Sequence, residues 1–274
     1  IAFGLYRYGK ADPYKGIDIA VIGSSLSRHA FPKNDPQPIR HPDRYFHLMM
    51  FPPKDEFALF GDDRTQARRA IAGVGEDELL GLLDNAIDNR VGTVLLEINP
   101  IVASFDFKAH DRPCDSNVQW ARHVATRYSE GIYNGLKRVR GKKSWDPGTE
   151  KAPKLYRAMT LDPADIARRY PLRIHWLCQP DRFAKQVERA RAQGTQIVLI
   201  KLPRSPYAQK AMGPEQVAAE AAMAKQMART YKLPLFMPGG RWSDAQFADQ
   251  GHVNIWGRMR LLSDFEAWSQ EHEL

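Results

Sequence analysis

The sequence predicts an α/β fold, a three-layer α/β/α sandwich around a mostly parallel sheet. Two patterns carry this prediction: short β-branched apolar runs that end in small or polar residues, and amphipathic helical stretches that alternate with them. Strand, helix and strand in succession imply right-handed parallel crossovers. With 274 residues and 43% hydrophobic side chains, the chain is long enough for one well-buried domain. We therefore expect a single domain over residues 1–274 that carries one large insertion.

The first elements surround the earliest apolar run. Residues 17–25, Ile-Asp-Ile-Ala-Val-Ile-Gly-Ser-Ser, are typical of a buried parallel strand that enters a turn. The proline-rich stretch 26–68 is expected to be irregular, with a candidate strand at 45–51. An apolar stripe predicts a helix over 76–90, whose acidic residues suit its positive N-terminus. A second buried strand is expected at 92–100.

The regular alternation breaks after this strand and resumes near residue 180. Residues 101–180 are aromatic, basic and weakly patterned, and their length far exceeds an ordinary connection, so they are predicted to form an insertion or lid. The remaining elements are, in order, a helix at 181–193, a strand at 196–202, a helix at 214–231, a short strand at 233–237 and a helix at 254–270. These elements complete the predicted sandwich.

The chain is basic, with a formal net charge of +8 and a pI near 9.4. Basic side chains concentrate in residues 122–157, which either form a solvated face or mobile loop or contact an anionic glycan, a lipid headgroup or a membrane. No nucleic-acid motif or basic recognition helix accompanies this charge, so we expect no nucleic-acid partner.

The two cysteines fit neither a disulfide-rich scaffold nor a zinc ribbon. Cys114 and Cys178 either pair in an oxidising compartment or remain buried free thiols. His110 with Cys114, and His175 with Cys178, have spacings that a metal could use, but each pair lacks further ligands nearby. We therefore expect no metal and no cofactor.

Two short segments carry the chemistry. Ser25 lies in Gly23-Ser-Ser-Leu-Ser27, directly after the first buried strand, where a side chain stands at the carboxyl edge of a parallel sheet. Alone, such a segment is typical of a turn or a helix cap. Asp249 precedes His252 by three residues at the entrance to the last helix, so one turn could supply both a general base and the group that orients it.

These segments resemble two sequence blocks of the SGNH (GDSL-like) hydrolases. Gly23-Ser-Ser-Leu-Ser27 is similar to the Gly-Asp-Ser-Leu-Ser block, and Asp249-Gln-Gly-His252 is similar to the C-terminal Asp-x-x-His block. The resemblance implies the flavodoxin-like sandwich of that superfamily. It also implies a catalytic triad of Ser25, Asp249 and His252. Ser24 replaces the usual aspartate, a position that is not the triad acid in the family.

The same resemblance implies an oxyanion hole. Its donors would be the nucleophile Ser25, a glycine N–H and an asparagine side chain, all at carboxyl ends of strands. Gly73 fits the glycine position, with Gly75 as the alternative, and Asn99 fits the asparagine position. The asparagine block departs from the usual Gly-x-Asn-Asp, because here it reads Glu97-Ile-Asn-Pro100.

Candidate substrate contacts lie beyond the strand that ends at Leu202. Arg204 and Tyr207 follow this strand on the predicted active face, and they either bind substrate or belong to a loop surface. Among the tryptophans, the sugar-stacking candidates are Trp120, Trp145 and Trp242, in weakly patterned segments. Trp256 and Trp268 lie on the amphipathic final helix and are expected in the core.

The predicted function is a serine-dependent O-acyl esterase or acyltransferase that works through an acyl-serine, with water or a sugar hydroxyl as acceptor. The sequence looks like the SGNH branch that modifies cell-envelope or exopolysaccharide glycans beside a membrane-bound O-acyltransferase. The chain begins at Ile1, and residues 1–9 fit either the end of a trimmed apolar anchor or an ordinary N-terminus. We expect a periplasmic or extracytoplasmic protein, anchored by an N-terminal segment absent from this chain. The alternative is a non-catalytic glycan- or lipid-binding subunit.

Overall fold

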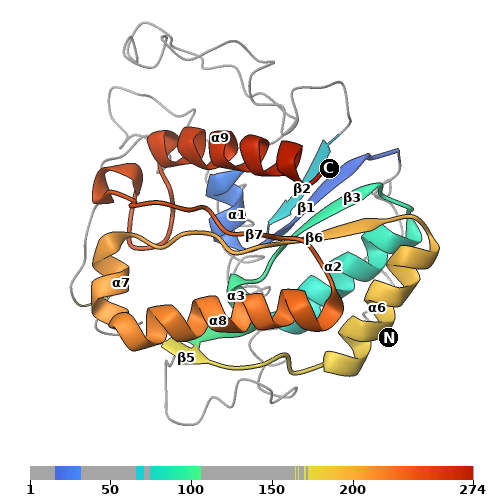
Figure 1. Cartoon of the computed structure of the whole chain (residues 1–274), viewed down its shortest axis with the longest axis horizontal. Coiled ribbons are helices and arrows are strands. Elements are labelled where there is room, and N and C mark those ends of the chain that lie inside the picture. Colours follow the sequence, from blue (N-terminus) through green and yellow to red (C-terminus); the bar gives the residue numbers. More distant parts are fainter. Residues whose placement is uncertain are drawn as a thin grey trace, which may run out of the picture.

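The computed structural model describes residues 16–31, 66–70, 75–105, 164, 166, 170 and 172–273. Its centre is a five-stranded parallel sheet in the order β2-β1-β3-β6-β7 (Figure 1). The strands are β1 (Ile19–Gly23), β2 (Gln66–Ala70), β3 (Thr93–Glu97), β6 (Gln196–Ile200) and β7 (Leu235–Phe236). The expected parallel α/β sheet is confirmed.

Alternating side chains of the central strands face two helical layers. Ala20 and Ile22 of β1 pack on one side with α2 (Glu76–Asp88), α6 (Pro180–Ala192) and α8 (Pro214–Tyr231), whereas Ile19 and Val21 pack on the other with α1 (Ser25–Ala30) and α9 (Ile255–Glu271). Figure 1 shows α9 above the sheet and α8 below it. The three-layer sandwich predicted from the sequence is therefore confirmed.

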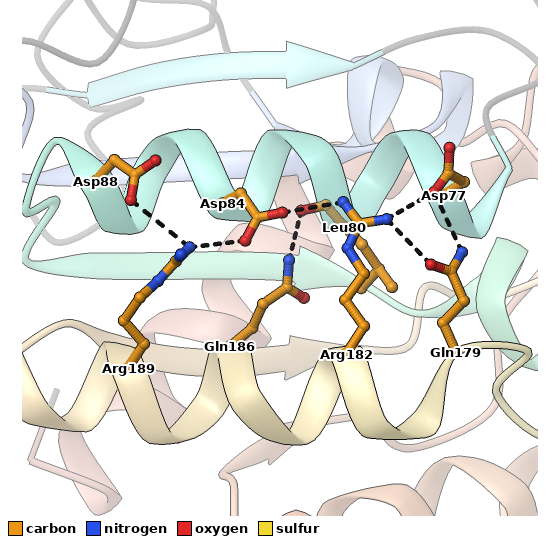
Figure 2. Close-up of polar contacts among 8 residues, drawn as sticks. All are labelled: Asp77, Leu80, Asp84, Asp88, Gln179, Arg182, Gln186 and Arg189. Carbon is orange, nitrogen blue, oxygen red and sulfur yellow. Dashed lines mark hydrogen bonds and ion pairs between the residues drawn. The ribbon is translucent and has the colours of Figure 1, made fainter.

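Polar contacts join α2 to α6 along their length (Figure 2). Asp84 accepts from Arg182 at 2.9 Å and from Arg189 at 2.7 Å. In the buried part of this contact, the Gln186 side chain donates to the Leu80 carbonyl at 2.7 Å. The bonds hold the helix that precedes β6 against the helix that precedes β3.

The segment predicted as an insertion begins and ends in a small second sheet. After α3 (Asn99–Val102), β4 (Ala103–Phe105) pairs antiparallel with β5 (Leu172–Ile174). The two ends of this segment, residues 103–105 and 172–174, are therefore neighbours in space. The basic segment 122–157 and the candidate strand at 45–51 lie outside the described residues.

The sequence patterns missed several of the described elements, among them α1, which lies at the start of the stretch expected to be irregular. β2 falls at the end of the stretch expected to be irregular; Gln-Ala-Arg-Arg-Ala lacks the β-branched and aromatic residues that favour strands, and it pairs only at the sheet edge, with β1. The helix α7 (Pro206–Met212) was also not predicted, because its seven residues are too few for a clear helical period. The other predicted boundaries agree with the structure to within a few residues.

Candidate active site

A serine follows the first strand directly and lies at the carboxyl edge of the sheet. β1 ends at Gly23, Ser24 is the N-cap of α1, and Ser25 is the first residue of that helix. The Ser24 hydroxyl accepts from the Leu26 N–H at 3.0 Å, which begins the helix at this point. Ser25 is therefore held at a sharp change from strand to helix.

The structure brings Ser25 together with both residues of the C-terminal block. His252 Nε2 lies 2.8 Å from Ser25 Oγ. His252 Nδ1 lies 2.8 Å and 2.9 Å from the two carboxylate oxygens of Asp249. Since a carboxylate only accepts hydrogen bonds, Nδ1 carries a proton and donates a hydrogen bond to Asp249, and Nε2 is left to accept one from the serine hydroxyl. Ser25, His252 and Asp249 thus form one continuous chain of hydrogen bonds.

Hydrogen bonds within the Asp-x-x-His turn fix the histidine. Asp249 Oδ1 also accepts from the backbone N–H groups of Gly251 at 3.0 Å and His252 at 2.8 Å. An isolated antiparallel bridge between Phe247 and Val253 closes the turn at its base. Phe247 is fully buried, so the turn stands on the hydrophobic core.

The residues after the histidine join this turn to α9. Asn254 caps the helix by accepting from the N–H groups of Trp256 at 3.0 Å and Gly257 at 3.2 Å, and it donates to the Ala245 carbonyl at 2.7 Å. Gly257 lies so close to the Gln246 carbonyl that a Cβ would not fit. The run Val-Asn-Ile-Trp-Gly thereby fixes the turn against its helix.

Asn99 lies where an oxyanion donor was predicted, at the carboxyl end of β3. Its side chain is buried and pairs with the backbone of Leu202: Nδ2 donates to the Leu202 carbonyl at 3.0 Å, and Oδ1 accepts from the Leu202 N–H at 2.7 Å. An amide nitrogen carries two hydrogens, and the second one makes no bond to any described residue. Leu202 therefore fixes the plane of an amide that retains donor capacity.

The backbone around Ser25 shows a second donor. The N–H groups of Ser24 and Ser27 donate to Glu97, and that of Leu26 donates to Ser24 Oγ. Within the described part of the chain, the Ser25 N–H has no such acceptor. This N–H can therefore bind a negative oxygen formed beside the serine.

The structure does not identify the glycine that was predicted to donate its N–H to the oxyanion. Gly73 lies outside the described residues. The alternative, Gly75, is the N-cap of α2, and its N–H lies 3.4 Å from the Glu78 carboxylate.

Arg204, a candidate substrate contact, is buried and held by an acid. It donates to Glu220 at 2.7 Å, and Lys201 lies 3.1 Å from the same carboxylate. Burial disfavours the charged form of Glu220, but Arg204 and Lys201 outweigh it and lower the pKa of Glu220 to about 2. The pKa of Arg204 is raised, because Glu220 outweighs the burial of the guanidinium. This interior ion pair leaves Arg204 without an exposed face for substrate.

The burial of Trp242 and Trp256 is the reverse of what the sequence predicted. Trp242 is 7% exposed, packs in the core beside Phe247, and carries the Arg260 guanidinium 4.4 Å from its ring centre. Trp256, expected in the core, is 52% exposed in the first turn of α9. The expectation that Trp256 lies in the core was therefore wrong.

Tyr207 is half-buried on α7 and packs beside the small apolar cluster that contains Tyr170 and Met212. Its backbone N–H donates to Asp244 at 3.1 Å. The structure does not bring Tyr207 into the hydrogen-bonded triad. Trp120 and Trp145 lie outside the described residues.

The sequence analysis did not include Glu97 among the site residues. This carboxylate is 1% exposed and accepts hydrogen bonds from the residues on both sides of Ser25. An acid inside the apolar run Val-Leu-Leu-Glu-Ile was the signal available in the sequence.

Cys178 takes part in a disulfide, and Cys114, the chain's other cysteine, lies outside the described residues. Across the described residues, no three His, Cys, Asp or Glu side chains gather as a metal site would require. No helix in that part of the chain is both long and apolar enough to cross a bilayer.

No protein-family model and no curated protein matches the chain. Similar solved structures include a GDSL-like lipase from Bacteroides thetaiotaomicron, with 10% identity and a TM-score of 0.41, where the match covers 99% of this chain and 97% of that one. A lipase/acylhydrolase from Enterococcus faecalis has 9% identity and a TM-score of 0.41, with 93% and 96% covered. A catalytic mutant of Axe2, an acetylxylan esterase from Geobacillus stearothermophilus, has 12% identity and a TM-score of 0.40, with 93% and 94% covered. Similarities this remote do not decide the activity, which has to follow from the chain's own residues.

Proposed function

We propose that this chain is an SGNH-type serine esterase in which Ser25 attacks the carbonyl carbon of an acyl ester. One observation carries the proposal: Ser25 Oγ, His252 and Asp249 form a continuous hydrogen-bonded chain with distances of 2.8 Å at the serine and 2.8 Å at the acid. A serine hydroxyl is a weak nucleophile without an adjacent base. A histidine held in this tautomer supplies that base.

The first half-reaction forms an acyl-serine. As Ser25 Oγ bonds to the carbonyl carbon, its proton moves to His252 Nε2, and Asp249 stabilises the imidazolium through Nδ1. The carbonyl oxygen becomes negative in the tetrahedral intermediate, where the Ser25 N–H and the Asn99 amide are the donors proposed to bind it. When the carbon–oxygen bond of the ester breaks, the leaving alcohol takes the proton from His252.

The second half-reaction regenerates the serine. Water or a sugar hydroxyl gives its proton to His252 and attacks the acyl carbon, and Ser25 leaves with the proton returned to its oxygen. Water as acceptor makes the protein an esterase; a sugar hydroxyl makes it a transferase. The difference depends on whether water is excluded from the acyl-serine.

The substrate proposed here is an acetylated glycan of the cell envelope or an exopolysaccharide, modified together with a membrane-bound O-acyltransferase. The resemblance of the sequence to that SGNH branch supports this, and the net charge of +8 suits an anionic polymer. The Cys178 disulfide supports an extracytoplasmic site, because disulfides persist in oxidising compartments.

The test is release of p-nitrophenol from p-nitrophenyl acetate by the wild type, Ser25→Ala and His252→Ala, with a polysaccharide added as competing acceptor. We expect both variants to lose about 10³-fold or more in kcat while keeping the wild-type unfolding temperature. Acetyl transfer to the polymer would identify a transferase. Equal activity in the three proteins would refute the triad, and inactivity of all three with retained glycan binding would favour the binding subunit.

A further inference from the structure

A buried carboxylate lies beneath the turn that carries Ser25. Glu97 Oε2 accepts from the Ser24 N–H at 2.7 Å, from the Ser27 N–H at 3.1 Å and from the Ser27 hydroxyl at 2.6 Å. Its other oxygen accepts from the Ser24 hydroxyl at 2.6 Å. The donors come from the residue before Ser25 and from the residue two positions after it. One side chain of β3 therefore fixes the turn on both sides of the serine.

The register of the sheet places Glu97 there. Side chains alternate along β3, and Leu95 faces the layer that contains α1 and α9, so Glu97, two residues later, faces the same layer. A Cβ on Gly23 would overlap both the Glu97 carboxylate and the Ser27 hydroxyl. Gly23 is therefore the residue that lets this carboxylate approach the start of α1.

We propose that Glu97 is a positioning residue for catalysis, which acts through Ser24 and Ser27 to hold the Ser25 hydroxyl and N–H in their reactive geometry. The inference rests on the proposed function. Hydrogen bonds to an ionised group are roughly twice as strong as neutral ones, so four donors around one carboxylate hold a turn more rigidly than neutral side chains would. A misplacement of about 1 Å at a reacting group can cost on the order of 10²-fold in rate.

The bonds also explain the serine at position 24. Where the pentapeptide of the resembling family has an aspartate, this chain has Ser24, whose hydroxyl donates to Glu97 and accepts from Leu26. Two carboxylates in contact here would repel each other. In this chain the acid comes from β3, and the pentapeptide supplies donors to it.

Two substitutions test the proposal with p-nitrophenyl acetate as substrate. Glu97→Gln keeps the size and one acceptor oxygen but loses the charge, and we expect kcat to fall about 10-fold with KM within about twofold. Glu97→Leu removes every acceptor, and we expect a fall on the order of 10²-fold in the protein that folds. Asp84→Asn, on the opposite helical layer, is the control and should lower stability without changing kcat.

A cycle with Ser27→Ala separates positioning from a general loss of structure. Ser27→Ala should lower kcat several-fold in the wild type and by clearly less in Glu97→Gln, because Ser27 Oγ acts through the carboxylate and the substitution has already weakened that bond. Wild-type kcat in folded Glu97→Gln, a rise in KM alone, or independent effects of the two substitutions would each overturn the proposal. A wild type no more active than Ser25→Ala would instead refute the esterase itself.

Discussion

Ser25 is one of three serines in the turn after β1, and its hydrogen bonds set it apart from the other two. The Ser24 and Ser27 hydroxyls both donate to Glu97, whereas the Ser25 hydroxyl faces His252. The third position of the pentapeptide already suggested Ser25 from the sequence. The structure adds the physical reason, because the flanking hydroxyls are committed to a buried acid.

Asn99 is the side chain through which the proposed oxyanion hole can be tested. Asn99→Ala removes a side-chain donor proposed for the oxyanion, and we expect kcat to fall about 10²-fold to 10³-fold with a smaller change in KM. The steady-state rate with p-nitrophenyl acetate is the measurement. Gln186→Leu is the matched control, because Gln186 is also a buried amide bonded to a backbone carbonyl, but it lies between α2 and α6. A loss of stability without a loss of kcat in Asn99→Ala would contradict the oxyanion role.

At the scale of elements, the contact between α2 and α6 depends on charge as well as packing. Arg182 bridges Asp77 at 2.6 Å and Asp84 at 2.9 Å, and Arg189 joins Asp84 at 2.7 Å and reaches Asp88 at 3.6 Å (Figure 2). Exposed ion pairs contribute little individually, but Asp84 is shared by two arginines and partly buried. This carboxylate is therefore the centre of the network.

The pH dependence of stability tests that network. Partial burial disfavours the charged form of Asp84, but its hydrogen bonds and the arginines outweigh burial and hold its pKa below the ordinary 3.8. A depressed carboxyl pKa stabilises the fold above about pH 4, and the contribution disappears as the pH falls through the folded pKa. We expect Asp84→Asn to lower the free energy of unfolding by about 1 kcal/mol at pH 7, and by less near pH 3.

The measurement is urea unfolding of both proteins at each pH. Burial raises the pKa of Glu76, which gives this residue the opposite pH dependence, but Glu76 is present in both proteins. The difference between them therefore isolates Asp84. A difference that stays constant from pH 7 to pH 3 would mean that charge at Asp84 does not stabilise the contact.

At the level of the whole molecule, the site forms only when the start of α1 and the turn before α9 pack together. Ser25 and His252 are 227 residues apart in the chain. The serine is fixed by β1 and β3, and the histidine by the turn before α9, which packs on the same layer as α1. Gly251 contributes to this meeting, because a Cβ there would come within 3.2 Å of the Leu26 side chain.

Gly257 lies where the first turn of α9 packs against Gln246 and Val253. In Gly257→Ala the new methyl group would overlap the Gln246 carbonyl and press on Val253, so α9 or the triad turn has to shift. We expect a stability loss of about 1 to 3 kcal/mol and a lower kcat. Gly239→Ala is the control, since no atom of the described residues lies within 4 Å of a Cβ at that position. Thermal unfolding and kcat would be measured together, and unchanged values for Gly257→Ala would contradict the close contact.

The alternation of strands and helices, the fold class, and the two segments that contain Ser25, Asp249 and His252 could all be predicted from the sequence. These features are local: they depend on side-chain period, on caps, and on residues a few positions apart. The tertiary structure supplied the distances that join the predicted partners Ser25 and His252, and it alone showed that Glu97 lies beneath the turn that carries Ser25. It also showed that Arg204 and Trp242 are buried and that Trp256 is exposed. Each of these depends on the register between distant strands or on the docking of one helix, and local sequence patterns do not specify contacts across that distance.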